Sequence, residues 1–117
     1  MSTILIVEDN TDVAILYERI FPQHNCFIVD SVGSAIAYIN ETIPDLVILD
    51  FHLNESYGLD LLTYMRAQPH LINTPVLGIS GDDFLEERAN RKGLTAFLRK
   101  PLEMIQLIMV GRRLLQS

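Results

Sequence analysis

Short apolar runs alternate along the chain with segments in which apolar residues recur at helical spacing. Runs of four or five apolar residues fit buried strands, whereas repeats at every third or fourth position fit the covered face of a helix. Strands are predicted at 3–7, 26–30, 45–49, 75–80 and 95–99. Helices are predicted at 11–21, with a cap at Asn10 or Thr11, and from Ser31 or Ser34 until Pro44 ends the second helix. A third helix follows a loop at 50–57 and stops before Pro69. The last two are predicted at 83–92 and at about 102–115.

The predicted strands are continuous apolar runs without alternation, and "LVIL" at 46–49 is the clearest case. This pattern is typical of a parallel sheet covered by helices on both faces. Right-handed crossovers place the C-terminal ends of all strands at one edge, where ligands bind in open α/β sheets. With 117 residues, we expect one α/β domain spanning 1–117, with its chemistry at that edge.

Charged and hydroxyl residues follow four of the predicted strands: Glu8 and Asp9, then Asp50, Ser80 and Lys100. Clustered carboxylates raise one another's pKa unless a cation compensates them. Oxygen-only ligands suit Mg²⁺, and Lys100 offers a second positive charge on the other side. Such a site suits a phosphoryl group, with Asp50 as the nucleophile that forms an acyl phosphate. That role also explains a carboxylate at the end of the most apolar strand, where a charge is costly to bury.

Taken singly, each of these residues has an ordinary explanation. Glu8 or Asp9 suits a helix N-terminus, Asp50 or Ser80 a turn, and Lys100 a solvated surface. Asp30, after the second strand, is interpreted only as a cap or a solvated turn residue. The hypothesis therefore depends on the combination.

The combination resembles the receiver domains of bacterial two-component response regulators. The acidic pair, the lone aspartate, the serine and the Lys-Pro pair occur in the family's order, and the resemblance covers essentially the whole chain. It implies a flavodoxin-like fold with five parallel strands in the order 2-1-3-4-5 and helices on both faces. It further implies that Asp50 accepts a phosphoryl group from a histidine kinase or phosphotransfer protein.

The resemblance also implies individual roles. Glu8, Asp9, Asp50 and the backbone carbonyl of His52 would bind Mg²⁺, Ser80 and Lys100 would contact the phosphoryl oxygens, and Ser80 with Phe97 would form the switch. Gly58 matches the family's loop glycine, and Lys100–Pro101 its cis peptide. The chain departs from the family where "HLNESYG" lacks the usual Met-Pro and where Gly81 replaces alanine.

Three alternatives of other classes are open. An FMN-binding protein of the same fold needs a hydroxyl- and glycine-rich phosphate loop after the first strand, where this chain has "VEDNTDV". An aspartyl-nucleophile phosphatase of the haloacid dehalogenase type has a second aspartate at the position of His52. A non-catalytic adaptor would not respond to acyl-phosphate analogues. We expect the chain to act as a signalling protein and not as an enzyme.

Charge and composition bear on partners and location. The net charge of −6 argues against nucleic acid as a direct partner. No apolar run could span a membrane, no signal peptide is recognised, and the lone Cys26 fits a reducing compartment, so a cytoplasmic location is expected. Whether the domain stands alone or belongs to a larger regulator or hybrid kinase is left open.

The last predicted helix carries more apolar residues than one covered face requires. We expect the buried face to hold Leu102, Ile105, Ile108, Met109 and Leu115. The surplus residues are Met104, Leu107, Val110 and Leu114. They either lie beside a neighbouring helix or, with residues 83–99, form a surface for a homodimer or an output domain.

Overall fold

The computed structural model describes residues 2–51 and 58–116. Within them lie five strands: β1 (Thr3–Val7), β2 (Asn25–Val29), β3 (Leu46–Asp50), β4 (Val76–Ser80) and β5 (Ala96–Arg99). The helices are α1 (Thr11–Arg19), α2 (Val32–Glu41), α3 (Gly58–Ala67), α4 (Asp83–Arg91) and α5 (Met104–Gln116), with a short 3-10 helix η1 (Pro69–Leu71). Every predicted element is present, with ends shifted by a few residues at most.

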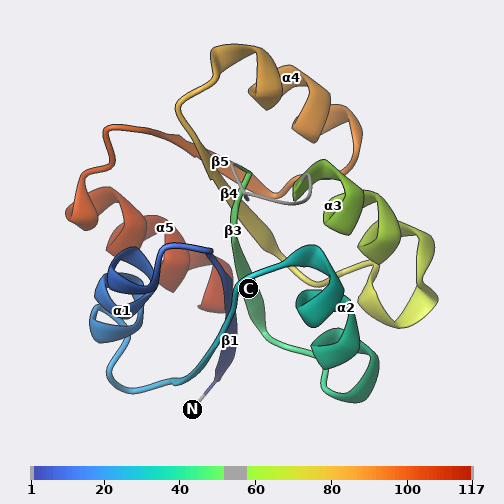
Figure 1. Cartoon of the computed structure of the whole chain (residues 1–117), viewed down its shortest axis with the longest axis horizontal. Coiled ribbons are helices and arrows are strands. Elements are labelled where there is room, and N and C mark those ends of the chain that lie inside the picture. Colours follow the sequence, from blue (N-terminus) through green and yellow to red (C-terminus); the bar gives the residue numbers. More distant parts are fainter. Residues whose placement is uncertain (1, 52–57, 117) are drawn as a thin grey trace.

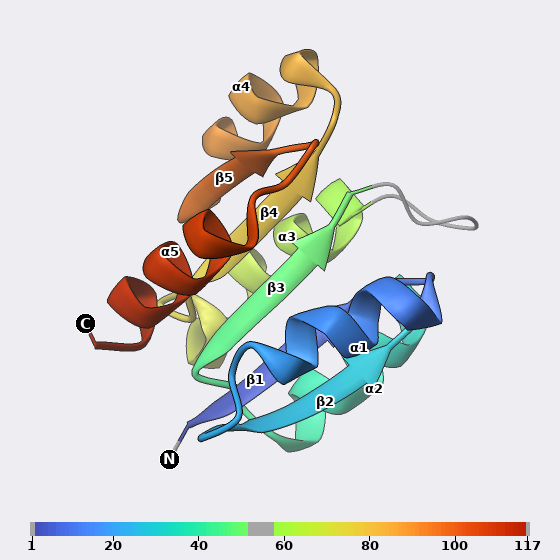
Figure 2. The same ribbon diagram turned by 90° about the vertical axis from the view of Figure 1, so that its left-hand side faces the viewer.

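The strands form one parallel sheet in the order β2-β1-β3-β4-β5, which confirms the expected fold. Figure 1 shows the sheet nearly edge-on, with α1 and α5 on one side and α2 and α3 on the other. Figure 2 shows the arrowheads of β3, β4 and β5 pointing the same way, so their C-terminal ends share one edge. No helix in the described ranges is long and apolar enough to cross a membrane.

Two apolar clusters hold these layers together. Leu5 and Val7 of β1 face α2, α3 and α4, whereas Ile4 and Ile6 face α1 and α5. Because successive strand residues point to opposite faces, a strand that is buried on both sides must be apolar throughout. This requirement produces the continuous runs seen in the sequence.

Side-chain caps begin two of the helices where the sequence predicted them. The Asn10 side chain accepts a hydrogen bond from the backbone N–H of Val13 at 3.2 Å, and the Ser31 hydroxyl accepts one from Ser34 at 3.1 Å. Each bond satisfies a backbone donor that has no partner inside its helix. The first cap orients α1 directly after the acidic residues that follow β1.

Arg66 joins α3 to the loops before β4 and β5. Its guanidinium donates to the carbonyls of Leu71 and Thr74 at 3.0 and 2.8 Å, and to that of Gly93 at 2.9 Å. Burial lowers the pKa of this half-buried guanidinium. Gly93, with φ of 93°, adopts the left-handed conformation that ends α4 and turns the chain toward β5.

Two phenylalanine rings lie against glycines, one on each face of the sheet. A Cβ at Gly111 of α5 would lie 2.5 Å from Cζ of Phe21, and a Cβ at Gly58 would lie 2.7 Å from Cδ1 of Phe51. A Cβ at Gly78 of β4 would overlap Cε2 of Phe51. Both rings are buried, at 2% and 4% exposure. The glycines therefore provide space that no other residue type would leave.

The buried face of α5 differs from the expected one. Leu107 and Gly111 are buried, while Ile105 and Met109 are 58% and 64% exposed. Leu102 and Leu115 do pack against the core, as expected, but so do residues that had been counted as surplus: Met104, Val110 and Leu114. Because apolar residues lie on nearly every side of α5, their spacing allowed more than one face; the approach of Gly111 to Phe21 selects this one.

Candidate functional site

Polar side chains meet at the C-terminal edge of the sheet. Glu8 follows β1, Asp50 ends β3, Ser80 ends β4 and Lys100 follows β5. Glu8, Asp50 and Ser80 are 4%, 2% and 0% exposed and, with Thr74, are the buried polar residues among those described. A buried carboxyl or hydroxyl group is costly unless it is paired, so this edge is a place of specific chemistry.

Lys100 compensates the charge of Asp50. Its Nζ lies 2.8 Å from Oδ2 of Asp50, whose side chain is 2% exposed, while the Lys100 side chain is 38% exposed. A charge-assisted bond of this kind contributes roughly 1.5 kcal/mol when one partner remains hydrated. The backbone N–H of Lys100 also donates to the carbonyl of Ser80 at 3.0 Å. These two bonds hold the ends of β3, β4 and β5 together.

Glu8 carries the strongest electrostatic perturbation of this edge. Burial, followed by a hydrogen bond to Asp50 and the charge of that residue, raises the pKa of Glu8 to about 8, and a hydrogen bond with Asp9 adds to the rise. The backbone N–H of Asn10 donates to Oε2 at 3.2 Å and opposes the shift. The pKa of the buried Tyr17 hydroxyl is also raised, by burial and by the charges of Glu8 and Asp50. This edge of the sheet therefore carries neighbouring negative charges whenever Glu8 ionises.

The donor set fits a hard divalent cation. Glu8, Asp9 and Asp50 offer only oxygen, and a cation beside them would relieve the repulsion that raises the pKa of Glu8. In residues 2–51 and 58–116, however, no three His, Cys, Asp or Glu side chains are arranged as a metal-ligand set. His52, the further ligand implied by the resemblance, lies outside the described residues. Metal binding by these residues stays a prediction.

Ser80 connects the site to helix α4. Its hydroxyl oxygen accepts a hydrogen bond from the backbone N–H of Asp82 at 3.0 Å. The Asp82 carboxylate in turn caps α4 by accepting from the N–H of Phe84 at 2.9 Å. A hydroxyl both donates and accepts, so Ser80 can hold this turn while it donates to an oxygen at the site.

Phe97 lies beside the site in β5, where it pairs in register with Gly78. The ring is half-buried and is stacked on Phe51 with a centroid distance of 6.3 Å and an interplanar angle of 23°. It also borders a surface groove with Glu86 and Gln106. Phe97 therefore packs against the core on one side and borders this surface groove on the other.

Three smaller expectations agree with the structure, and a fourth falls on residues that it does not describe. The cis bond at Lys100–Pro101 is present, and Gly58 begins α3 against Phe51. Asp30 is exposed at the end of β2, which agrees with its interpretation as a solvated turn residue. The loop departure after Phe51 lies outside the described residues.

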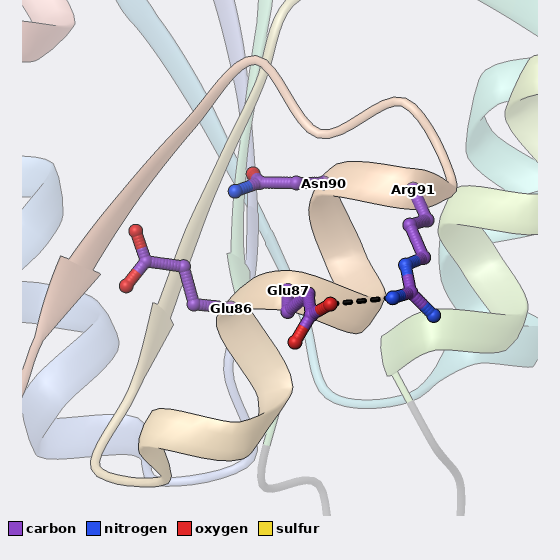
Figure 3. Close-up of a pocket in the computed structure, with 4 residues that line it drawn as sticks. All are labelled: Glu86, Glu87, Asn90 and Arg91. Carbon is purple, nitrogen blue, oxygen red and sulfur yellow. Dashed lines mark hydrogen bonds and ion pairs between the residues drawn. The ribbon is translucent and has the colours of Figure 1, made fainter.

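A separate hollow on α4 does not belong to this site. It has a volume of ≈ 460 Å³ and is lined by Glu86, Glu87, Asn90 and Arg91. Figure 3 shows Glu87 paired with Arg91 along the helix, while Glu86 points away from that pair. Glu86 pairs instead with Arg99 of β5 at 3.1 Å. These exposed charges compensate one another and face solvent, so the hollow offers no reactive group.

Phe51 was not predicted as a residue of this site. A signal was available: Gly78 interrupts an otherwise apolar strand, and a glycine inside a strand often marks the close approach of another group. The sequence does not show which group approaches, because Phe51 and Gly78 are separated by a whole helix.

Comparison with known proteins agrees with this geometry. The model of the response regulator receiver domain family matches residues 4–110. The transcriptional regulatory protein MalR of Bacillus subtilis is 33% identical over 107 residues, which cover 88% of this chain and 46% of MalR. The receiver domain of NtrX from Brucella abortus has a TM-score of 0.87 at 35% identity, covering 97% of this chain and 98% of that one. A signal receiver domain of a signal transduction histidine kinase from Syntrophus aciditrophicus has a TM-score of 0.90 at 28% identity, covering 99% and 91%.

The chain belongs to the response regulator receiver family, whose members act in two-component signalling. It spans about half the length of MalR. The similarity to the receiver domain of NtrX and to the receiver domain of a histidine kinase extends over nearly the whole of both solved chains.

Proposed function

We propose that Asp50 accepts a phosphoryl group from the phosphohistidine of a histidine kinase or of a phosphotransfer protein. The carrying observation is the buried Asp50 carboxylate, held by Lys100 and placed beside Glu8. A carboxylate oxygen of Asp50 attacks phosphorus and forms an acyl phosphate. The bond from phosphorus to the imidazole nitrogen breaks, and its electron pair stays on that nitrogen.

The neighbouring residues supply binding and charge. Mg²⁺, held by Glu8, Asp9, Asp50 and the carbonyl of His52, would neutralise charge on the transferring group. The Lys100 ammonium compensates Asp50 before transfer and a phosphoryl oxygen after it. The role is one of signalling and not of substrate turnover, and His52 stands where a related phosphatase would have its second aspartate.

The signal would leave the site through Ser80 and Phe97. Ser80 would donate to the phosphoryl group while it still accepts from Asp82, so that its movement toward the phosphoryl oxygen is passed to the turn that caps α4. A hydrogen bond to a charged group is worth roughly 1.5–3 kcal/mol, which shifts a two-state ratio by about ten- to a hundredfold. Movement of Ser80 would also leave space beneath β5 for Phe97 to turn inward. Both changes would alter the surface made by α4, β5 and α5.

This surface suits a protein partner, either an output domain or a second copy of the chain. Phe84 of α4 is 85% exposed, and Ile105 and Met109 of α5 are 58% and 64% exposed. Exposed apolar residues on elements that are proposed to respond to phosphorylation favour association. We propose that residues 1–117 work as one such module in the cytoplasm, without direct contact to nucleic acid or membrane.

The experiment compares Asp50→Asn with Asp30→Asn, a matched change at the exposed end of β2. The parent and Asp30→Asn should gain one phosphoryl mass with acetyl phosphate and Mg²⁺, and excess chelator should abolish the gain. Asp50→Asn should gain none, while its circular dichroism shows an intact fold. Labelling of Asp50→Asn at the parent rate would place the acceptor elsewhere.

The partner surface needs its own measurement. Sedimentation with beryllofluoride should detect association that Met109→Lys weakens and that Ile72→Lys, at a residue 53% exposed after η1, leaves unchanged. A monomer at all concentrations, with and without beryllofluoride, would exclude the homodimer and favour an output domain as the partner.

A further inference from the structure

We propose that Phe51 is a positioning residue that holds the Phe97 ring in its half-buried place and links it mechanically to Asp50. The inference extends the proposed function, because it gives Asp50 a route to the surface of β5 that does not pass through Ser80. It depends on the contacts of Phe51 with two glycines, with β4 and with Phe97.

The ring of Phe51 is confined by backbone on two sides. A Cβ at Gly58 would lie 2.7 Å from its Cδ1 and 3.1 Å from its Cα, and a Cβ at Gly78 would lie 3.0 Å from its Cζ and closer still to its Cε2. Backbone yields less readily than a flexible side chain, so the ring has little freedom to shift sideways. At 4% exposure it is also screened from solvent.

Phe51 is the residue directly after Asp50, and its own backbone is attached to β4. Its N–H donates to the carbonyl of Ile79 at 3.1 Å. Any displacement of the Asp50 backbone therefore reaches the Phe51 ring, and the ring cannot absorb the displacement by sliding past Gly58 or Gly78.

Phe97 receives this displacement because its ring is stacked on that of Phe51 at 6.3 Å and 23°. Gly78, which pairs in register with Phe97, offers no side chain between the two rings. The stack favours the half-buried position of Phe97, and its loss should raise the ratio of exposed to buried Phe97 by about two- to tenfold.

A core residue without this role would stabilise the fold and leave Phe97 unaffected. Phe21 is a suitable control, since it is also a buried phenylalanine that packs against a glycine, Gly111. It lies on the opposite face of the sheet, in the cluster with α1 and α5. Phe21→Leu and Phe51→Leu should therefore destabilise the fold by similar amounts but differ at Phe97.

The experiment places para-fluorophenylalanine at position 97 of the full chain and records its fluorine NMR resonance. Without phosphorylation, Phe51→Leu should move the resonance toward the value of the solvent-exposed ring, and Phe21→Leu should leave it at the parent position. Phe51→Met, which keeps an apolar side chain but has no ring to stack on Phe97, should move the resonance in the same direction. If Phe51→Leu proves too unstable, Phe51→Met compared with Phe21→Met provides the same test.

Beryllofluoride then separates this inference from the proposed function. The parent resonance should move on addition, and Phe51→Leu should show at most half of that movement. If Phe51→Leu keeps the parent resonance, or responds fully, the role of Phe51 is wrong while the function of Asp50 stands. If the parent protein shows no change in its resonance with beryllofluoride and no phosphoryl label at Asp50, the proposed function is refuted. The comparison of variants without beryllofluoride still decides whether Phe51 holds Phe97.

Discussion

Replacing Glu8 by glutamine removes an ionisable group from the C-terminal edge of the sheet with little change in side-chain size, and the effect on stability should depend on pH. Glu8 is 4% exposed, and its pKa is raised from 4.5 to about 8 by burial and by Asp50. In the unfolded chain that carboxyl group is hydrated and ionises near its ordinary pKa. Between these values the folded protein holds a proton that the unfolded chain has released.

The sign and size of the effect follow from proton linkage. Because the folded pKa of Glu8 is the higher one, its contribution to stability is greatest below about pH 4.5 and is lost as pH rises toward about 8. The loss from a single proton is at most about 1.4 kcal/mol per pH unit. Glu8→Gln keeps a neutral hydrogen-bonding group at this position, so its stability should fall less steeply.

The assay is urea unfolding in chelator, repeated from about pH 5 to about pH 9. Glu41→Gln, the same chemical change at the exposed end of α2, is the control. Adding Mg²⁺ should stabilise the parent most at high pH, where Glu8 is ionised, and should stabilise Glu8→Gln less. Parallel pH profiles for the parent and Glu8→Gln would refute the raised pKa of Glu8 and the proton that it holds in the folded protein.

Three further variants test other parts of the structure. Arg66→Met leaves several carbonyl acceptors without their donor and should cost about 2–4 kcal/mol in urea unfolding, with Arg66→Lys intermediate; a loss below about 1 kcal/mol contradicts its bridging role. Gly81→Ala should add about 0.4–1 kcal/mol to unfolding stability without slowing labelling, because the new Cβ meets only Cβ of Lys100 at 3.7 Å; a loss of stability contradicts this. Ser80→Ala should still label at Asp50, but its NMR shifts at Phe97 and α5 should respond less than those of the parent.

The sheet and its functional edge could be predicted from the sequence because both depend on short-range patterns. A strand buried on two faces must be apolar throughout, so "LVIL" indicated β3 without knowledge of its neighbours. Parallel order then brought the ends of the strands together, which placed Asp50 and Lys100 at one edge before any distance was known.

The parts that could not be predicted depend on long-range packing. The predicted buried face of α5 was wrong at Ile105 and Met109. The face that is buried is selected by Phe21, which lies far away in sequence. The contact of Phe51 with Phe97 likewise joins the residue after β3 to β5, which is far away in sequence. A pattern of apolar residues shows that a position can be buried, but it does not show which residue will cover it.

The contact between Phe21 and Gly111 limits the order in which this sequence can evolve. Gaining a side chain at position 111 first would place its Cβ 2.5 Å from the ring of Phe21. Losing the ring first would leave a cavity, and a change from phenylalanine to alanine in a core costs about 3–5 kcal/mol. Either first step uses a large share of the roughly 5–15 kcal/mol that stabilises a domain. Lineages that carry a larger residue at 111 should therefore have passed through a smaller residue at 21, after other substitutions had made the fold more stable.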